Sequence, residues 1–114
     1  MNTEFFRNRK IRFSDHPRFA NVKIAALVTG KKTDTVSVCL LDIAPNTEIP
    51  VHTHDPQVDS IFVVAGQGKA FVNGNWRDIE AGDYIFVPVL EEHGIRNSGA
   101  ASLRLFVHHS PPLL

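Results

Sequence analysis

Short runs rich in β-branched and aromatic residues, separated by Gly, Pro, Asn and Asp at intervals of roughly 8–12 residues, characterise this chain. No segment longer than about ten residues has the 3.6-residue hydrophobic period of an amphipathic helix. The pattern therefore predicts an all-β protein. We expect its strands at residues 22–28, 35–43, 50–54, 58–64, 70–72, 76–79, 84–87, 93–97 and 103–109.

Turn residues separate these runs. Asn73-Gly74 lies between two strand-like runs and predicts a hairpin with a type I′ turn, whose twist matches that of its flanking strands. Residues 30–34 and 44–47 also have turn composition, and Asn46 suits a left-handed backbone better than any residue except Gly.

Composition narrows the functional classes. With 114 residues and 43% hydrophobic positions, we expect one domain with one core, and a single Cys excludes an internal disulfide framework. Twelve basic and twelve acidic residues leave no excess charge for a phosphate backbone, so nucleic acid is not an expected partner. No apolar run reaches the roughly 20 residues of a membrane helix, and we expect a cytoplasmic protein with no membrane contact.

Three histidines are candidate metal ligands. If His52 and His54 belong to one strand, their side chains share a face, about 7 Å apart. Pro56 then closes a short turn, and the run from Val58 brings Asp59 back on an adjacent strand as an oxygen ligand. His93, after another strand-like run, supplies a third nitrogen.

These motifs resemble those of the cupin superfamily. Residues 46–66, with His52, His54, Asp59 and Gly66, resemble the first cupin motif, and residues 82–97, with Gly82, Pro88, His93 and Asn97, resemble the second. The resemblance covers roughly residues 24–107 and implies a small single-domain cupin: a jelly-roll barrel, or double-stranded β-helix of the RmlC-like type. Three positions depart from the family pattern: Asp59 replaces the usual Glu, Asn46 the usual Gly, and Leu90 a common Gly.

The implied cofactor is one divalent transition metal. Three imidazoles and a carboxylate suit Fe or Mn best, and Ni, Cu or Zn are alternatives, whereas Mg²⁺ is disfavoured. Asp59 is one methylene shorter than Glu, so it binds the metal directly, binds it through water, or accepts a hydrogen bond that orients a histidine. The alternative without a metal is that His52 and His54 are rim residues bonded to the backbone.

A substrate pocket is predicted from strand alternation. Arg104 on the solvent face puts Leu105, Val107 and His109 inward, so His109 is either an acid/base at the pocket mouth or a surface residue near the chain end. The resemblance places Cys39 on the inner face, as a small buried hydrophobe or as a thiol that faces the substrate. Together with these residues, an apolar chamber for a small organic molecule is expected to include Leu41, Ile49, Ile61 and Ile95.

Three functional hypotheses follow, because this barrel hosts several functions. The leading one is a metal-dependent, dioxygenase-like enzyme acting on a small-molecule substrate, with Asp59 and His109 as catalytic residues. The second is an isomerase, lyase or decarboxylase whose metal is a Lewis acid that stabilises an enolate. The third is a small-molecule binding or sensing module without catalysis.

The expected organisation is an N-terminal arm or opening strand (1–20), the barrel (21–110) and a short tail (111–114). The basic arm is interpreted as a solvated strand, with anion or partner binding as the alternative, and His16 as a surface loop residue. Runs such as Ile61-Phe62-Val63-Val64 are apolar on both faces, so we expect a homodimer to cover the outer one. The tail either packs on that outer face or frays.

Overall fold

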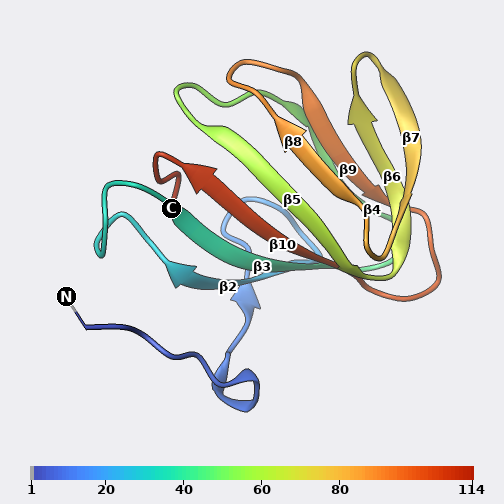
Figure 1. The fold of residues 1–114 in the computed structure, drawn as a ribbon. Coiled ribbons are helices and arrows are strands. Elements are labelled where there is room, and N and C mark those ends of the chain that lie inside the picture. The colour runs from blue at the N-terminus through green and yellow to red at the C-terminus, as the bar shows by residue number, and fades with distance from the viewer. Residues whose placement is uncertain (1) are drawn as a thin grey trace.

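Ten strands alternate with turns in the computed structural model, which describes residues 2–114 (Figure 1). The elements are η1 (Asn8–Lys10), β1 (Ser14–Asp15), β2 (Val22–Val28), β3 (Ser37–Ile43), β4 (Thr47–His52), β5 (Val58–Ala65), β6 (Gln67–Val72), β7 (Asn75–Glu80), β8 (Tyr84–Val87), β9 (His93–Asn97) and β10 (Leu103–Ser110). The predicted all-β class is confirmed. Within the described part of the chain, no helix is long and apolar enough to cross a membrane.

The strands form two antiparallel sheets, ordered β1-β2-β3-β10-β5-β8 and β4-β9-β6-β7. The chain changes sheet six times: between β3 and β4, β4 and β5, β5 and β6, β7 and β8, β8 and β9, and β9 and β10. This repeated crossing produces a jelly-roll barrel, and it confirms the predicted fold class.

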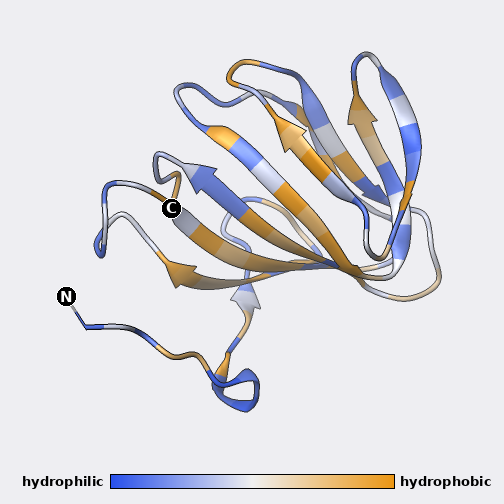
Figure 2. Ribbon diagram, in the orientation of Figure 1, coloured by the Kyte–Doolittle hydropathy of each residue, from blue (hydrophilic) through white to orange (hydrophobic). Residues whose placement is uncertain are grey.

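The core lies between the sheets and follows from alternation along the strands. On β10 the residues at 103, 105, 107 and 109 are buried, whereas those at 104, 106 and 108 are half-buried. The most deeply buried large side chains include Ile43, Val63 and Leu105. Figure 2 shows hydrophobic residues along much of β5, the neighbour of β10 in this sheet. The predicted inward face of β10 is therefore confirmed.

The polar side chain of Asn97 ties this barrel together at the end of β9. Its Nδ2 donates to the carbonyls of Ile43 (2.8 Å) and Ala101 (2.9 Å), and its Oδ1 accepts from the backbone N–H of Gly99 (2.9 Å). Both polar atoms of this completely buried side chain are therefore paired, as buried polar groups require.

Positive φ angles occur where the sequence suggested turns. Asn73 (φ 50°) and Gly74 (φ 82°) are the two left-handed residues that a type I′ hairpin needs, and they connect the paired strands β6 and β7. Asn46 is also left-handed (φ 58°), as predicted. Leu90 (φ 67°) is the unexpected case, because a bulky side chain disfavours this conformation. Asn46 and Leu90 are the two positions where the sequence departs from family glycines.

Strand ranges were predicted more accurately than strand partners. The ranges of β2, β8 and β9 are as predicted, but β4 ends at His52, so His54 lies in the connection rather than on the strand. The predicted arrangement of Asp59 on a strand adjacent to His52 is also wrong. β4 and β5 belong to opposite sheets, because the connection between them crosses the barrel instead of forming a hairpin.

Both chain ends differ from expectation. The opening strand is limited to β1, which pairs with β2, and the preceding arm has one turn of 3-10 helix. The tail neither frays nor covers an outer face. Hydrogen bonds hold the tail against the barrel. The Leu114 carbonyl accepts from the backbone N–H of Gly30 (2.8 Å), and the Leu113 N–H donates to Ser37 Oγ (3.0 Å). The side-chain amide of Gln57 donates to the Pro112 carbonyl (3.2 Å).

Candidate metal centre

Both sheets contribute side chains to one cluster inside the barrel. His52 at the end of β4 lies directly opposite His93 at the start of β9 in the strand register. Asp59 on β5 and His109 on β10 are paired in the same way in the other sheet. His54 comes from the connection between β4 and β5, held where its carbonyl accepts the backbone N–H of Leu90 (2.9 Å).

Asp59 is the centre of this cluster. Its Oδ2 lies 3.1 Å from His93 Nε2, 3.3 Å from His109 Nε2 and 3.6 Å from His54 Nε2. Asp59, His93 and His109 are buried, and their exposed fractions are 4%, 3% and 7%. One carboxylate oxygen therefore faces three imidazole nitrogens in a site from which water is largely excluded.

The electrostatics favour an ionised Asp59. Burial disfavours its charged form, but hydrogen bonds from the three surrounding imidazoles outweigh burial and hold the pKa of Asp59 well below its usual range. For His93, burial acts to lower the pKa, yet Asp59 and the Glu91 carbonyl outweigh it and raise the pKa. At His52 burial prevails and lowers the pKa. In the metal-free protein the cluster is thus held by charge-assisted hydrogen bonds.

The orientation of two histidines suits metal binding. Nδ1 of His52 lies 2.7 Å from the Pro50 carbonyl, and Nδ1 of His93 lies 3.1 Å from the Glu91 carbonyl. A carbonyl accepts only, so each Nδ1 carries the proton and each Nε2 can offer a lone pair to a cation. Backbone or carboxylate acceptors hold metal-binding histidines in this way in general.

The spacing of donor atoms also fits an ion. Ligand atoms of His52, His54 and His93 lie within 4.8 Å of one another, as do those of His54, Asp59 and His109. Two ligands at right angles on a metal, each bonded at about 2.1 Å, lie roughly 3 Å apart, which is close to the separations around Asp59 Oδ2. Among residues 2–114, Asp59 Oδ1 and His109 Nδ1 are the buried side-chain polar atoms without a hydrogen-bond partner. The residues present therefore fit a transition metal.

The cluster lies at a cavity of about 300 Å³. All the apolar residues predicted for the chamber line it, namely Leu41, Ile49, Ile61, Ile95, Leu105 and Val107, and so does Cys39. Cys39 is 2% exposed, and burial, with the nearby charge of Asp59, raises the pKa of its thiol to about 12. A neutral buried thiol packs as a small hydrophobe.

Sequence reasoning missed two parts of the cavity. A segment before β2 contributes His16, Arg18 and Phe19, and the tail contributes Leu113 and Leu114. His16, interpreted as a surface residue, is half-buried at this cavity. Neither segment has strand periodicity or a motif that would place it at the cavity. The one sequence feature that could have indicated a role was a His and an Arg beside aromatic residues.

An interior jelly-roll cavity with converging imidazoles and a carboxylate defines this molecule as a barrel protein of the cupin class. A model of the cupin domain family matches residues 39–109, which is most of the chain and includes all five clustered residues. The chain belongs to the cupin domain family.

Individual relatives are more distant. An oxalate-binding protein of Thermotoga maritima is 29% identical over 63 residues, which are 55% of this chain and 52% of that protein, so the match spans about half the length of this relative. Many solved structures share the fold, and three serve as examples. A predicted oxalate decarboxylase from Thermotoga maritima has a TM-score of 0.84 at 20% identity, over 95% of this chain and 99% of that one.

The other two are enzymes by name. The polyketide cyclase RemF from Streptomyces resistomycificus has a TM-score of 0.82 at 17% identity, covering 99% of this chain and 87% of its own. The ectoine synthase from P. lautus has a TM-score of 0.81 at 19% identity, covering 97% and 80%. At these identities the likeness establishes the fold.

Proposed function

We propose that this protein is a metal-dependent enzyme that moves protons on a small organic substrate, with His52, His54, His93 and Asp59 as metal ligands. The observation that carries the proposal is the position of His109. It is a fourth imidazole, which faces the same cavity and has its Nε2 3.3 Å from Asp59 Oδ2. A metal enzyme that uses Lewis-acid chemistry needs such an acid/base group next to the ion.

Each residue has a distinct task in this proposal. The metal, when bound, polarises a substrate oxygen and so acidifies a neighbouring C–H bond. Asp59 stays ionised and keeps the imidazoles oriented. His109 Nε2 donates to Asp59, so the lone pair of the neutral ring is on Nδ1, which has no hydrogen-bond partner among the described residues. Nδ1 accepts the substrate proton and returns it at another position, and the apolar walls of the cavity exclude water from this transfer. Isomerisation and elimination follow from such a step. Decarboxylation uses its second half, because loss of CO₂ leaves an electron pair on the substrate carbon, which takes a proton from the protonated His109.

The names of some neighbours are in keeping with this class of reaction. A cyclase, a synthase and a predicted decarboxylase are among the proteins with this fold. Dioxygenase-like chemistry is the second candidate, and the observation that favours it is the three-imidazole group of His52, His54 and His93, because such a nitrogen-rich set suits Fe(II). A binding module without catalysis is the third.

Metal content is the first test. We expect protein purified without chelator, or reconstituted with Fe(II), Mn(II) or Zn(II), to hold about one ion per chain by elemental analysis. His93→Ala should lower the metal content severalfold. His108→Ala is the matched control, since His108 precedes His109 but points outward, with its ring 4.6 Å from that of Phe106. Protein that stays empty after reconstitution would refute the proposal.

Proton exchange then separates the two kinds of chemistry. Under anaerobic conditions in D₂O, we expect the metal-loaded protein to speed exchange of the C3 protons of pyruvate or 2-oxobutanoate, measured by NMR. His109→Gln should reduce exchange by about 100-fold or more while keeping the metal. Oxygen uptake with 2-oxo acids and no anaerobic exchange would instead favour the dioxygenase-like alternative.

A further inference from the structure

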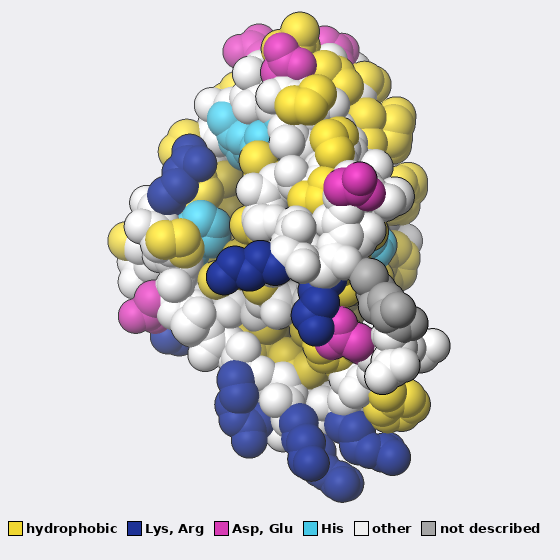
Figure 3. All heavy atoms as spheres, turned by 90° about the vertical axis from the view of Figure 1, so that its left-hand side faces the viewer, with side chains coloured by type: hydrophobic (Ala, Val, Ile, Leu, Met, Phe, Trp, Pro, Cys, Tyr) yellow, Lys and Arg dark blue, Asp and Glu magenta, His cyan; other side chains and the backbone are white. Residues whose placement is uncertain are grey.

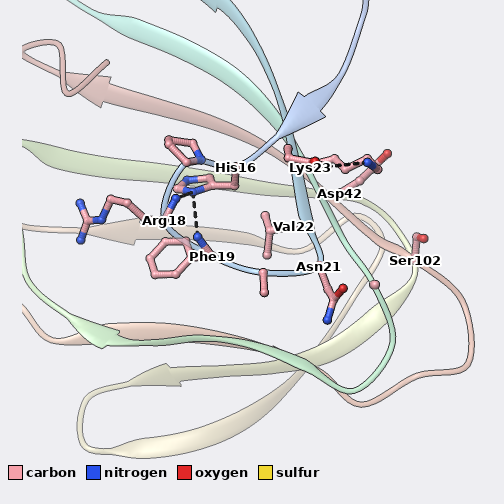
Figure 4. Close-up of a pocket in the computed structure, with 12 residues that line it drawn as sticks. His16, Arg18, Phe19, Asn21, Val22, Lys23, Asp42 and Ser102 are labelled. Atoms are coloured by element: carbon pink, nitrogen blue, oxygen red, sulfur yellow. Dashed lines mark hydrogen bonds and ion pairs between the residues drawn. The ribbon is translucent and has the colours of Figure 1, made fainter.

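The mouth of the cavity carries a positive charge that the proposed mechanism does not use. Arg18 and His16 are the polar side chains that the segment before β2 adds to an otherwise apolar wall. Figure 4 draws a second pocket, which shares His16, Arg18 and Phe19 with the cavity, and shows these three residues close together on this segment, away from Lys23 and Asp42. Viewed from the side drawn on the left of Figure 1, histidine side chains reach the surface near Lys and Arg side chains (Figure 3).

Hydrogen bonds give this segment a fixed conformation. His16 Nδ1 accepts from the backbone N–H groups of Arg18 (3.0 Å) and Phe19 (3.3 Å), and the His16 ring lies 4.7 Å from that of Phe19. Because Nδ1 accepts, the proton of the neutral ring is on Nε2, which remains a donor. Burial, together with the charge of Arg18, lowers the pKa of His16 and keeps its ring neutral.

Arg18 differs from the arginines that stabilise the sheets. Arg104 makes two hydrogen bonds of 2.7 Å to Asp42, and Arg96 makes one of 2.8 Å to Glu48. The ion pairs of residues 2–114 do not include Arg18, whose guanidinium carbon lies 5.6 Å from the Phe19 ring centroid. Its five N–H donors are therefore available to a planar anion.

The wall between the two polar ends is hydrophobic. Ile24, Leu41 and Leu105 are among the residues that line the cavity together with Arg18 and the metal cluster. A volume of about 300 Å³ is small for a ligand site and limits the ligand to a compact molecule. The cavity thus has a metal end, an apolar wall and a cationic mouth. A ligand that matches these three regions has a metal-binding oxygen group, a short apolar body and an anionic group.

We propose that Arg18, assisted by His16, binds a carboxylate of the substrate at the cavity mouth, so that the substrate is a small acid with a second oxygen group at the metal end. The placement of that second group rests on the proposed metal function. The carboxylate is the favoured anion because its two oxygens match the fork of the guanidinium. Arg18 is thus a specificity-determining residue.

The experiment uses linear dicarboxylates from malonate to adipate, together with their diamides, as probes of length and charge. We expect at least one dicarboxylate to bind the Mn(II)-loaded protein in calorimetry. Arg18→Gln should weaken binding of that dicarboxylate by about tenfold, since a hydrogen-bonded charge pair is lost, and should change binding of its diamide, which has no carboxylate, by less than about twofold. Arg77→Gln, the same change on the exposed face of β7, is the control and should leave both affinities unchanged.

The outcomes separate this inference from the metal proposal. Metal loading without any effect of Arg18→Gln overturns the role of Arg18 alone, as does the failure of every dicarboxylate to bind. A protein that takes up no metal but binds butyrate in an Arg18-dependent way supports the carboxylate site and refutes the metal function. Arg18 is exposed, so the variant should melt at the wild-type temperature, and this is checked by calorimetry.

Discussion

Asp59 shows how one substitution in a motif is accommodated. The family pattern has Glu at this position. The side chain of Asp is one methylene shorter and would not reach the metal site if the surrounding groups stayed where Glu requires them. Here the carboxylate is approached by imidazoles from three elements, including His109 on the neighbouring strand β10. The barrel thus brings a fourth histidine to hydrogen-bonding distance of the shorter side chain.

The ionisation of this cluster predicts that the stability of the metal-free protein depends on pH. The pKa of His93 is raised, so its stabilising contribution is complete below the unfolded pKa of about 6.5 and is lost as the pH rises through the folded value. Asp59, whose pKa is lowered, is ionised throughout this range and adds no slope. We expect the stability advantage of wild type over His93→Gln to decrease from pH 6 to pH 9.

Thermal denaturation in EDTA measures this advantage. His108→Gln is the control, and its difference from wild type should not follow the same trend, because His108 lies on the outer face of β10. An advantage that grows with pH would contradict the assigned ion pair. The metal-loaded protein should lose the trend, since the ligating nitrogen no longer binds a proton.

At the scale of elements, the turn between β8 and β9 positions a residue of the site but contains a strained backbone conformation. Leu90 adopts φ 67° while its N–H donates to the His54 carbonyl, and its side chain is 58% exposed. A left-handed conformation costs a residue with a side chain about 1–2 kcal/mol. The strain is therefore located in the backbone that positions a ligand.

Replacing Leu90 by Gly should relieve that strain. We expect Leu90→Gly to raise the free energy of unfolding by about 0.5–1 kcal/mol, since the relief exceeds the chain entropy that glycine adds to the unfolded state. Val89→Gly is the control, because Val89 has no positive φ and should lose stability. Urea denaturation measures both, and a less stable Leu90→Gly would refute the strain assignment.

The elements also show what the sequence could predict. Alternation and turn residues located most strands, because each depends on neighbours within a few positions. The histidine motifs indicated a metal cluster for the same reason. The crossing after β4 depends on packing between sheets, so the strand partner of Asp59 was predicted wrongly. The contacts of Arg18 and Leu114 with the cavity join segments far apart in sequence and leave no periodic signal.

At the scale of the whole molecule, one outer sheet face is unusually apolar. On β5 and β8, the side chains of Phe62 and Val64 are each 42% exposed, Tyr84 is 58% exposed and Phe86 is 56% exposed. Phe62 lies opposite Tyr84 in the strand register, so these side chains form one patch. Contiguous apolar surface of this kind marks contact sites on soluble proteins.

We predict that two copies of the chain pair through this patch. A standard interface takes about 800 Å² from each partner, roughly a ninth of the 7003 Å² surface of this chain, and the outer faces of β5 and β8 would form its centre. Phe86→Glu should convert the dimer to monomers in analytical ultracentrifugation, because two like charges would meet across the two-fold axis. Phe5→Glu makes the same change on the arm, where Phe5 is 77% exposed, and should leave the dimer intact. A wild-type protein that sediments as a monomer at high concentration would refute this prediction, and the outer face would then need another partner.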